Sequence, residues 1–391
     1  MTVVSEYRRK GIGLLMNEPF AIRREKLLAQ LLQEDVKGFL VSNPTNVSYL
    51  TGFSGDSSFL LLSNEEAVLI SDGRYTTQME EECPDLDAHI RPPAQPIHEA
   101  SAELIQGKGL ASLAVESQHL TLAGFEVLKE KAPSVDWNFT SGWVEQIRMV
   151  KDETELQQIK DAIWIAERAL SMFLPMLKGD DTEKDLADRM ESYIRLVGGK
   201  CTSFPPITAV GDRAALPHAT PTNKKVQESD LLLVDWGADG GNYKSDLTRV
   251  FVPRRKFSSS STNKSFTDEL QKIYNVVLAA QTEAIRALRP GVLSGDVDAA
   301  ARKVITDAGY GKQFNHSLGH GIGRDIHEGP MLRSGTKTEM LPGMVVTIEP
   351  GIYLPGWGGV RIEDDVLVTP DGCEVLSSVP KAFDEQFAEY A

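Results

Sequence analysis

Two strand-like segments of this chain carry acidic side chains where a sheet would normally bury apolar ones. The first is LLLVDWGADGGNYKSDLTRV, at residues 231–250, and the second is MVVTIEPGIYLPGWGGVRIEDDVLVT, at residues 344–369. In each segment two apolar runs flank glycine-rich turn residues, a pattern that predicts a β-hairpin. A carboxylate inside a buried strand costs free energy unless a partner accompanies it. If these strands are buried, the fold must therefore supply positive charge beside both hairpins.

The acidic residues of the first segment are spaced symmetrically. Asp235 and Asp246 are equidistant from the centre of the Gly-Gly pair at 240–241. A turn at that centre would place them directly opposite each other on one face, with Cβ atoms about 5 Å apart. The simpler interpretation is a surface hairpin whose two aspartates are solvated.

The second segment repeats the construction with a longer loop, because Glu349 and Glu363 are equidistant from Gly356. Four carboxylates gathered at about 5 Å would repel by about 3 kcal/mol per pair at an effective dielectric of about 20. Two divalent cations would cancel that charge. The spacing within each hairpin does not show that the hairpins converge, and Arg249 or Arg361 could instead form salt bridges with the glutamates.

A third segment, NHSLGHGIGRDIH at residues 315–327, holds three of the seven histidines. His316 and His320 have the i, i+4 spacing of two zinc ligands on one helix face. The alternating glycines at 319, 321 and 323 disfavour a regular helix, so we expect the histidines to have different roles.

Two domains are expected from the length of 391 residues and from a change in the pattern of apolar residues along the chain. An amphipathic helix at 22–34 is followed by short apolar runs separated by turns, which predicts an α/β domain that ends near residue 140. From about Lys151, helical segments alternate with strand-like runs, which predicts an α+β domain with antiparallel strands and helices packed on one side.

Composition excludes some classes of function. A net charge of −15 disfavours a nucleic-acid binder or a protein of anionic membrane surfaces. We find no apolar run of about 20 residues and no signal-peptide pattern. Three cysteines lie far apart without a CxxC motif, which is typical of a reducing compartment. The expected location is the cytoplasm.

Residues from about 150 to 385 resemble the catalytic domain of the creatinase/prolidase metallopeptidase family, which has the pita-bread fold. Within that family they look most like the Xaa-Pro aminopeptidase and Xaa-Pro dipeptidase branch. The motifs are the two hairpins, SFPPITAVGDRAALPHA (203–219) and FNHSLGHGIGRDIHEGP (314–330). NPTNVSYLTGFSG (43–55) and SDGRYTTQ (71–78) resemble the N-terminal part of the same branch.

The resemblance implies an α+β protein with two domains. Residues 1–145 would form a creatinase-like α/β domain, with 1–20 as an extension. Residues 146–391 would form the pita-bread catalytic domain, a curved antiparallel sheet with flanking helices. A homodimer is typical of relatives with this layout.

Carried over residue by residue, the resemblance implies a two-metal centre, with ligands Asp235, Asp246, His320, Glu349 and Glu363. Asp246 and Glu363 would bridge the two ions. This oxygen-rich set suits Mn²⁺ or Co²⁺, and Zn²⁺ is possible. No organic cofactor is implied.

The resemblance also implies the chemistry, in which a hydroxide that bridges the two metals attacks the peptide carbonyl and Glu349 shuttles its proton. His218 and His327 match donors to the negative charge that develops. His316 matches a position beside the scissile carbonyl and the proline site. Arg361 matches an arginine that anchors the centre through a carboxylate.

The expected substrate is a peptide with proline at its second position, and the sequence leaves open whether the enzyme is an aminopeptidase or a dipeptidase. Methionine aminopeptidase is the alternative, since GHGIGR followed by HE also occurs there and Arg324 replaces the leucine frequent in the Xaa-Pro branch. RIEDD around Glu363 and the preceding domain of about 140 residues favour the Xaa-Pro branch. A non-catalytic binding or chaperone module is the weaker alternative, because all five ligand types are present.

Overall fold

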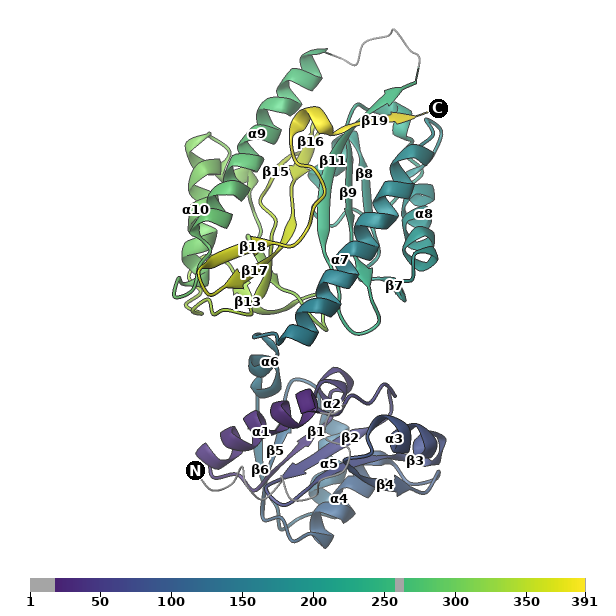
Figure 1. The fold of residues 1–391 in the computed structure, drawn as a ribbon, viewed down its shortest axis with the longest axis vertical. Helices are drawn as coiled ribbons and strands as arrows, with labels where there is room; N and C mark the ends of the chain where they lie inside the picture. Colours follow the sequence, from purple (N-terminus) through teal and green to yellow (C-terminus); the bar gives the residue numbers. More distant parts are fainter. Residues whose placement is uncertain (1–17, 257–263, 391) are drawn as a thin grey trace. The chain divides into compact units, whose positions relative to one another are not determined.

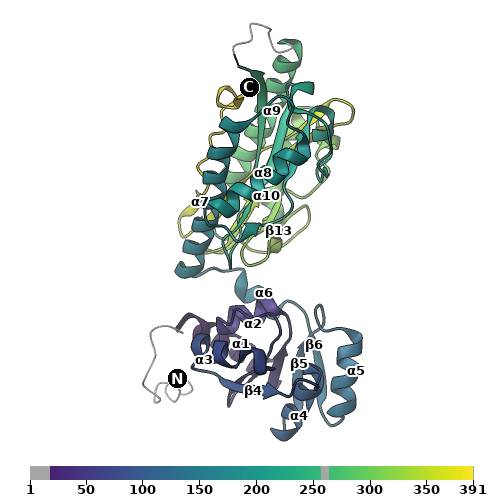
Figure 2. The ribbon, with the colours of Figure 1, turned by 90° about the vertical axis from the view of Figure 1, so that its right-hand side faces the viewer.

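The computed structural model describes residues 18–256 and 264–390 of the chain (Figures 1 and 2). These residues divide into two compact units, Met1–Ile147 and Arg148–Ala391. Most of the extension predicted at residues 1–20 lies outside the described residues. Within the described ranges, no helix has the length and apolar character needed to span a membrane.

The first unit is a six-stranded mixed sheet between two layers of helices. The strand order is β4-β3-β2-β1-β5-β6, with bounds β1 (Gly38–Val41), β2 (Phe59–Ser63), β3 (Ala67–Asp72), β4 (Asp87–Arg91), β5 (Ser112–Glu116) and β6 (Asp136–Thr140). The helices are α1 (Glu18–Gln33), α2 (Pro44–Thr51), α3 (Thr76–Glu82), α4 (Ile97–Gly107), α5 (Leu122–Lys131) and α6 (Trp143–Arg148).

Alternation along the central strand β1 explains why both faces of this sheet are covered. Phe39 and Val41 enter one apolar core with side chains of α1 and α2, whereas Leu40 enters another with side chains of α4 and α5. A strand that is apolar on both faces reads as a continuous apolar run, as GFLV does. The predicted α/β character of this half is confirmed.

The second unit contains four long helices and several antiparallel ladders. The helices are α7 (Glu153–Phe173), α8 (Glu183–Leu196), α9 (Lys264–Ala287) and α10 (Ser294–Asp307). One sheet has the order β19-β11-β9-β8, with bounds β8 (Ile207–Val210), β9 (Leu232–Trp236), β11 (Leu247–Arg255) and β19 (Phe387–Tyr390). A second has the order β13-β12-β14-β17-β18, with bounds β12 (Gly319–Gly321), β13 (Glu328–Leu332), β14 (Val345–Ile348), β17 (Asp364–Thr369) and β18 (Gly372–Val375). Two short ladders join β7 (Cys201–Thr202) to β10 (Ala238–Asp239) and β15 (Gly351–Leu354) to β16 (Gly358–Arg361).

Helices flank the β9–β11 sheet on both sides. Leu233 and Val250 pack into a core with α9 and α10, whereas Val234 and Phe251 pack into a core with α7 and α8. Figure 1 shows α9 and α10 on one side of the strands and α7 and α8 on the other. The predicted α+β class with flanking helices is confirmed. The expectation that the helices pack on one side of the strands is wrong, because β9 and β11 are apolar and buried on both faces.

The first carboxylate hairpin does not have the register that we predicted. In the β9–β11 ladder Asp235 faces Thr248, not Asp246. Asp246 lies two residues before Thr248, which places it on the same face as Asp235 but diagonal to it. The two aspartates are therefore neighbours without being directly opposed.

The tip of this hairpin explains the difference. The turn is formed by Gly241 and Asn242, one position later than the Gly-Gly centre, and Gly241 has a φ of 113°, which favours glycine. Asp239 and Lys244 face each other across the turn, with Lys244 Nζ 2.6 Å from Asp239 Oδ2. This ion pair and the glycine conformation set the register, and a symmetric count of residues takes account of neither.

The second hairpin keeps the register predicted from its spacing about Gly356. The pairs on either side of the two glutamates are Ile348 with Asp364 and Gly351 with Arg361. Glu349 and Glu363 therefore face each other where the β14–β17 ladder gives way to the β15–β16 ladder. An isolated bridge between Thr248 and Glu363 links this hairpin to the first.

Arg249 is fully buried and stabilises the region where the two hairpins meet. Its guanidinium donates to Asp364 Oδ1 over 2.7 Å. It also donates to four backbone oxygens, those of Thr248 (2.9 Å), Glu363 (2.6 Å), Val379 (2.7 Å) and Pro380 (3.2 Å). Burial would raise the pKa of Asp364, but Arg249 and Lys381 hold that pKa below its usual range. A charged pair thus anchors the backbone that carries Glu363.

Replacing Arg249 with methionine should lower the free energy of unfolding of the second unit by about 3–5 kcal/mol, because removing one partner leaves a buried charge uncompensated. Urea unfolding followed by tryptophan fluorescence measures the loss. Arg286→Met is the control, since Arg286 is 75% exposed in its pair with Glu283 and should matter by less than about 0.5 kcal/mol. Equal unfolding midpoints for the two variants would contradict the anchoring role.

Candidate metal centre

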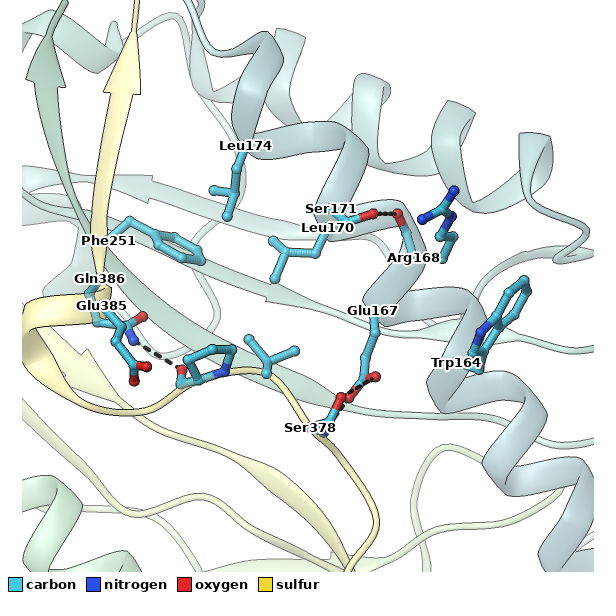
Figure 3. A pocket seen from close by; sticks show the side chains of 12 residues that line it. Trp164, Glu167, Arg168, Leu170, Ser171, Leu174, Phe251, Ser378, Glu385 and Gln386 are labelled. Carbon is cyan, nitrogen blue, oxygen red and sulfur yellow. Dashed lines mark hydrogen bonds between the residues drawn. The ribbon is translucent and has the colours of Figure 1, made fainter.

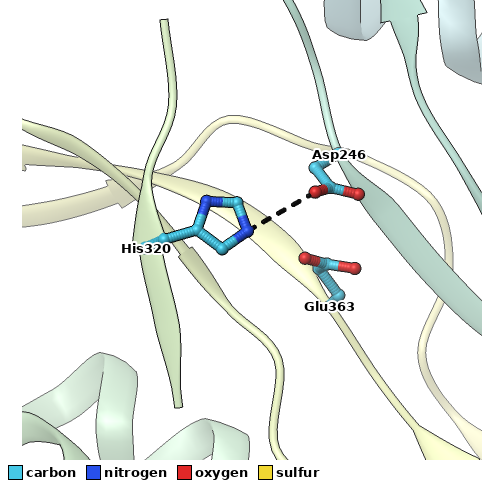
Figure 4. A group of neighbouring side chains, drawn as sticks. All are labelled: Asp246, His320 and Glu363. Atoms are coloured by element: carbon cyan, nitrogen blue, oxygen red, sulfur yellow. Dashed lines mark ion pairs between the residues drawn. The ribbon is translucent and has the colours of Figure 1, made fainter. Parts of the chain in front are cut away.

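Three buried side chains from separate segments converge in the second unit. Asp246, His320 and Glu363 each offer one ligand atom, and these atoms lie within 4.8 Å of one another. Figure 4 shows the imidazole facing both carboxylates. Asp246 immediately precedes β11, His320 is the central residue of β12 and Glu363 immediately precedes β17.

The other two predicted ligands border the same cluster. Glu349 Oε1 lies 3.6 Å from His320 Nε2, and Asp246 Oδ2 lies 3.7 Å from that nitrogen. Asp235 is buried on β9, where its Oδ2 accepts from Arg361 Nη2 over 2.6 Å. The structure therefore brings the five predicted ligand residues together.

The cluster holds more negative charge than its surroundings neutralise. Burial above all, and then the neighbouring carboxylates, raise the pKa of Asp246 and Glu363 well above the ordinary range. Burial likewise raises the pKa of Glu349, to about 8. Burial also raises the pKa of Asp235, although Arg361 opposes this. Such carboxylates bind either protons or cations.

The imidazole of His320 is oriented for a cation. Its Nδ1 lies 3.0 Å from the carbonyl oxygen of Gly321, which can only accept, so Nδ1 carries the hydrogen and Nε2 is a lone pair. Burial lowers the pKa of His320 to about 4, and the ring is neutral at pH 7. A lone pair that faces two carboxylates is repelled by them unless a cation lies between.

Two carboxylate oxygens support the same interpretation. Asp235 Oδ1 and Asp246 Oδ1 are buried and have no hydrogen-bond partner among the described residues. Buried oxygens without partners are costly, and a divalent ion is the group that such a set of oxygens and one imidazole nitrogen would bind. The residues present fit a centre of divalent metal ions.

The remaining predicted residues surround the cluster. The ring centroid of His327 lies 4.4 Å from that of His320. His327 is exposed as a residue, but its ring is shielded enough from water for desolvation to lower its pKa. His218 is exposed and follows a short helical turn at 211–215, and it lies close enough to His327 and Asp235 to influence the pKa of both. These placements leave the catalytic roles of both histidines as predictions.

His316 is bonded at both ring nitrogens. Its Nδ1 lies 2.7 Å from Ser317 O, which assigns the hydrogen to Nδ1, and its Nε2 lies 2.9 Å from Tyr353 OH. Tyr353 therefore donates to His316 while it accepts from Arg361 Nη1 over 2.9 Å. His316 can donate to a substrate through Nδ1 only after the bond to Ser317 O breaks, and its Nε2 can accept from a substrate only after the bond from Tyr353 breaks.

Sequence reasoning missed two residues of this network, Tyr353 and Thr248. Tyr353 connects His316 to Arg361, and Thr248 accepts from Arg361 Nε over 3.1 Å and donates to Glu363 Oε2 over 2.6 Å. A correct register for the first hairpin would have identified Thr248, since Thr248 faces Asp235 directly. The position of Tyr353 in its hairpin gave no comparable signal.

Close packing explains the glycines around His320. A Cβ on Gly319 would lie 2.0 Å from Thr347 O, and one on Gly321 would lie 2.0 Å from Gly329 O. Strand β12 thus packs so closely against β14 and β13 that only glycine fits at positions 319 and 321. The predicted absence of a regular helix here is confirmed.

A separate hollow of about 430 Å³ lies between α7 and residues 378–386 (Figure 3). Trp164, Leu170 and Phe251 line it, and Glu167 on its edge accepts from Ser378 Oγ over 2.7 Å. None of the predicted site residues lines this hollow. The cluster of carboxylates is therefore the stronger candidate for a reactive site.

Comparison with known families matches both halves of the chain. Residues 157–370 match the model of metallopeptidase family M24, and residues 23–150 match that of the creatinase/prolidase N-terminal domain. The Xaa-Pro dipeptidase of Pyrococcus horikoshii is 32% identical over 368 residues, which cover 94% of this chain and 99% of that protein.

Solved structures agree over the same length. The Xaa-Pro dipeptidase from Bacillus anthracis has a TM-score of 0.86 and 34% identity, and covers 93% of this chain and 98% of its own. The X-Pro aminopeptidase from Thermotoga maritima has a TM-score of 0.83 and 32% identity, and covers 94% of this chain and 99% of its own. Proteins named for the two activities are thus nearly equally similar to this chain.

Replacing Gly321 with alanine should weaken Mn²⁺ binding and lower the unfolding temperature, because the new Cβ forces β12 away from β13 and moves His320. Calorimetric titration and thermal unfolding measure the two effects. Gly372→Ala is the matched control, since Gly372 lies in strand β18 with open space around its Cβ position. A Gly321→Ala protein that behaves like Gly372→Ala would contradict the close packing.

In the metal-free protein, stability should fall as pH rises from about 7 to 8, above the range in which the lowered pKa of His320 has the opposite effect. The carboxyl pKa values are raised above their unfolded values, to about 8 for Glu349, so the folded state holds more protons and loses stability as they dissociate. Mn²⁺ at about 100 times its Kd should add about 2.7 kcal/mol and reduce this fall. Thermal unfolding at several pH values with and without Mn²⁺ checks this. Glu363→Gln should flatten the metal-free profile, and a profile that rises in this range would contradict the prediction.

Proposed function

Since the chain belongs to metallopeptidase family M24 and carries a creatinase/prolidase N-terminal domain, we propose that it is an exopeptidase that cleaves the bond before proline. The observation that carries this proposal is the buried cluster in which a neutral His320 Nε2 faces carboxylates with raised pKa values. Residues 146–391 would form the catalytic domain and residues 1–145 the N-terminal domain. Two relatives named for Xaa-Pro cleavage support the substrate class.

Two divalent ions would be held by the predicted ligand set, Asp235, Asp246, His320, Glu349 and Glu363. Mn²⁺ is the ion that we propose, since four carboxylates and one imidazole form a hard, oxygen-rich set. When bound, the ions acidify a water molecule, so that a nucleophile is available at neutral pH.

Glu349 would transfer the proton that the reaction requires. In the metal-free protein burial raises the pKa of its carboxyl group to about 8. Cations bound beside it would lower that pKa, so Glu349 would be a carboxylate able to accept a proton. The nitrogen of an Xaa-Pro bond belongs to a tertiary amide and leaves as an amine only after it gains a proton. Glu349 would take the proton from the attacking water and deliver it to that nitrogen.

The histidines would orient the substrate and balance the charge that develops on its carbonyl oxygen. His327 and His218 are exposed near the cluster, and a ring N–H of each would donate to that oxygen. Arg361 would keep Asp235 in place through the 2.6 Å bond to its Oδ2. His316 would join the substrate contacts by exchanging its bond with Tyr353 for one with the peptide.

We expect the protein, once stripped by a chelator and reloaded with Mn²⁺, to cleave Xaa-Pro peptides and to leave Met-Ala peptides intact. Glu349→Gln should lower kcat by about 10²–10⁴-fold, as expected for the loss of a general base. Glu374→Gln, a change on the surface strand β18, serves as the control and should leave kcat unchanged.

A tripeptide with proline at its second position separates the two remaining activities, because an aminopeptidase cleaves it and a dipeptidase does not. Cleavage of Met-Ala but of no Xaa-Pro bond would overturn the substrate assignment in favour of a methionine aminopeptidase. Absence of turnover on every peptide would favour a binding module.

A further inference from the structure

Gln281 is a polar side chain inside the apolar core of the second unit. It lies on α9, is fully buried, and its Nε2 has three acceptors, Ile348 O at 3.1 Å, Ile362 O at 3.2 Å and Asp364 Oδ2 at 3.0 Å. Three acceptors around one atom identify it as the amide nitrogen. Its Oε1 has no hydrogen-bond partner among the described residues, which costs about 1–3 kcal/mol. A side chain retained at such a cost requires an explanation.

The acceptors of Gln281 adjoin the two glutamates of the candidate centre. Ile348 immediately precedes Glu349, and Ile362 and Asp364 flank Glu363. One amide group therefore contacts the backbone beside both glutamates, which belong to opposite arms of one hairpin.

The ladder between these arms is interrupted at Pro350. In the shared register Ile362 faces Pro350, and Ile362 N donates to Pro350 O over 3.4 Å. An uninterrupted antiparallel pair would return a bond from the N–H of residue 350 to Ile362 O, but proline has no N–H. The Gln281 amide supplies the donor that Pro350 lacks.

We propose that Gln281 is a positioning residue that fixes the separation between the arms carrying Glu349 and Glu363, and hence the site for divalent ions. The inference rests on the proposed metal centre. Repulsion between the two carboxylates acts to separate the arms, and the Gln281 amide opposes this by bonding to both. Arg249 and Thr248 hold only the Glu363 arm, so neither can replace it.

The test compares Gln281→Met with Gln386→Met. Gln386 is also buried, also donates to two backbone oxygens, those of Pro380 (3.0 Å) and Ala382 (3.1 Å), and also has an Oε1 without a partner in the described chain. It contacts neither glutamate arm. Mn²⁺ affinity by calorimetry is the main readout, followed by kcat and KM at saturating Mn²⁺.

We expect Gln281→Met to weaken Mn²⁺ binding by about 10–100-fold, and Gln386→Met to change it by less than about twofold. A Gln281→Met affinity within twofold of the wild type would overturn the proposal, as would an equal loss in both variants. If Gln281→Met does not fold, Gln281→Asn takes its place with the same expected loss, because its amide is too short to reach both arms.

A rescue experiment separates positioning from general stability. Pro350→Ala restores an N–H opposite Ile362 O, so the loss caused by Gln281→Met should be at least threefold smaller in the Pro350→Ala background. Strictly additive losses in the double variant would overturn the proposal.

Failure of the proposed function gives a different result. A wild-type protein that binds Mn²⁺ but cleaves no Xaa-Pro peptide overturns the substrate assignment alone, because the affinity comparison does not depend on it. A wild-type protein that binds no divalent ion overturns the metal centre and this inference together.

Discussion

Electrostatic repulsion among four carboxylates, three of them buried, is the interaction on which the second unit depends. Among the described residues, Arg361 is the one cationic side chain that bonds to any of Asp235, Asp246, Glu349 and Glu363, and it bonds to Asp235. The surrounding hydrogen bonds hold a carboxylate by one oxygen, as Arg361 holds Asp235 and Thr248 holds Glu363. Asp235 Oδ1 keeps no bond within the described chain, and neither does Asp246 Oδ1, so oxygens of the cluster keep lone pairs that could bind a cation.

Two kinds of interaction keep the carboxylates and His320 in place. Hydrogen bonds from buried donors act on the hairpin that carries the glutamates, where Arg249 and Gln281 bond to its backbone oxygens. Steric exclusion acts on the histidine strand, where Gly319 and Gly321 allow β12 to approach its neighbours. The first kind tolerates small movements, whereas the second does not, because atoms at van der Waals contact cannot approach further.

The sequence predicted much of this arrangement because short-range regularities encode it. Symmetric spacing about Gly356 gave the register of the second hairpin, and the resemblance in four motifs brought the five ligand residues together. Spacing failed in the first hairpin because the Asp239–Lys244 ion pair and the positive φ of Gly241 moved its turn. Tyr353 and Gln281 escaped notice because their partners are distant in sequence, and no periodicity records such contacts.

The turn at Gly241 and Asn242 has a consequence for how this chain can vary. It lies at the tip of the hairpin, several residues from Asp235 and Asp246, yet its position and length decide which residues of the two strands face each other. Exchanges of surface side chains there, other than those of Asp239 and Lys244, would leave the pairing intact. An inserted or deleted residue would slide one strand along the other and turn an aspartate away from the other carboxylates of the cluster. A change in the length of this turn would therefore disrupt the candidate metal centre from a position outside it.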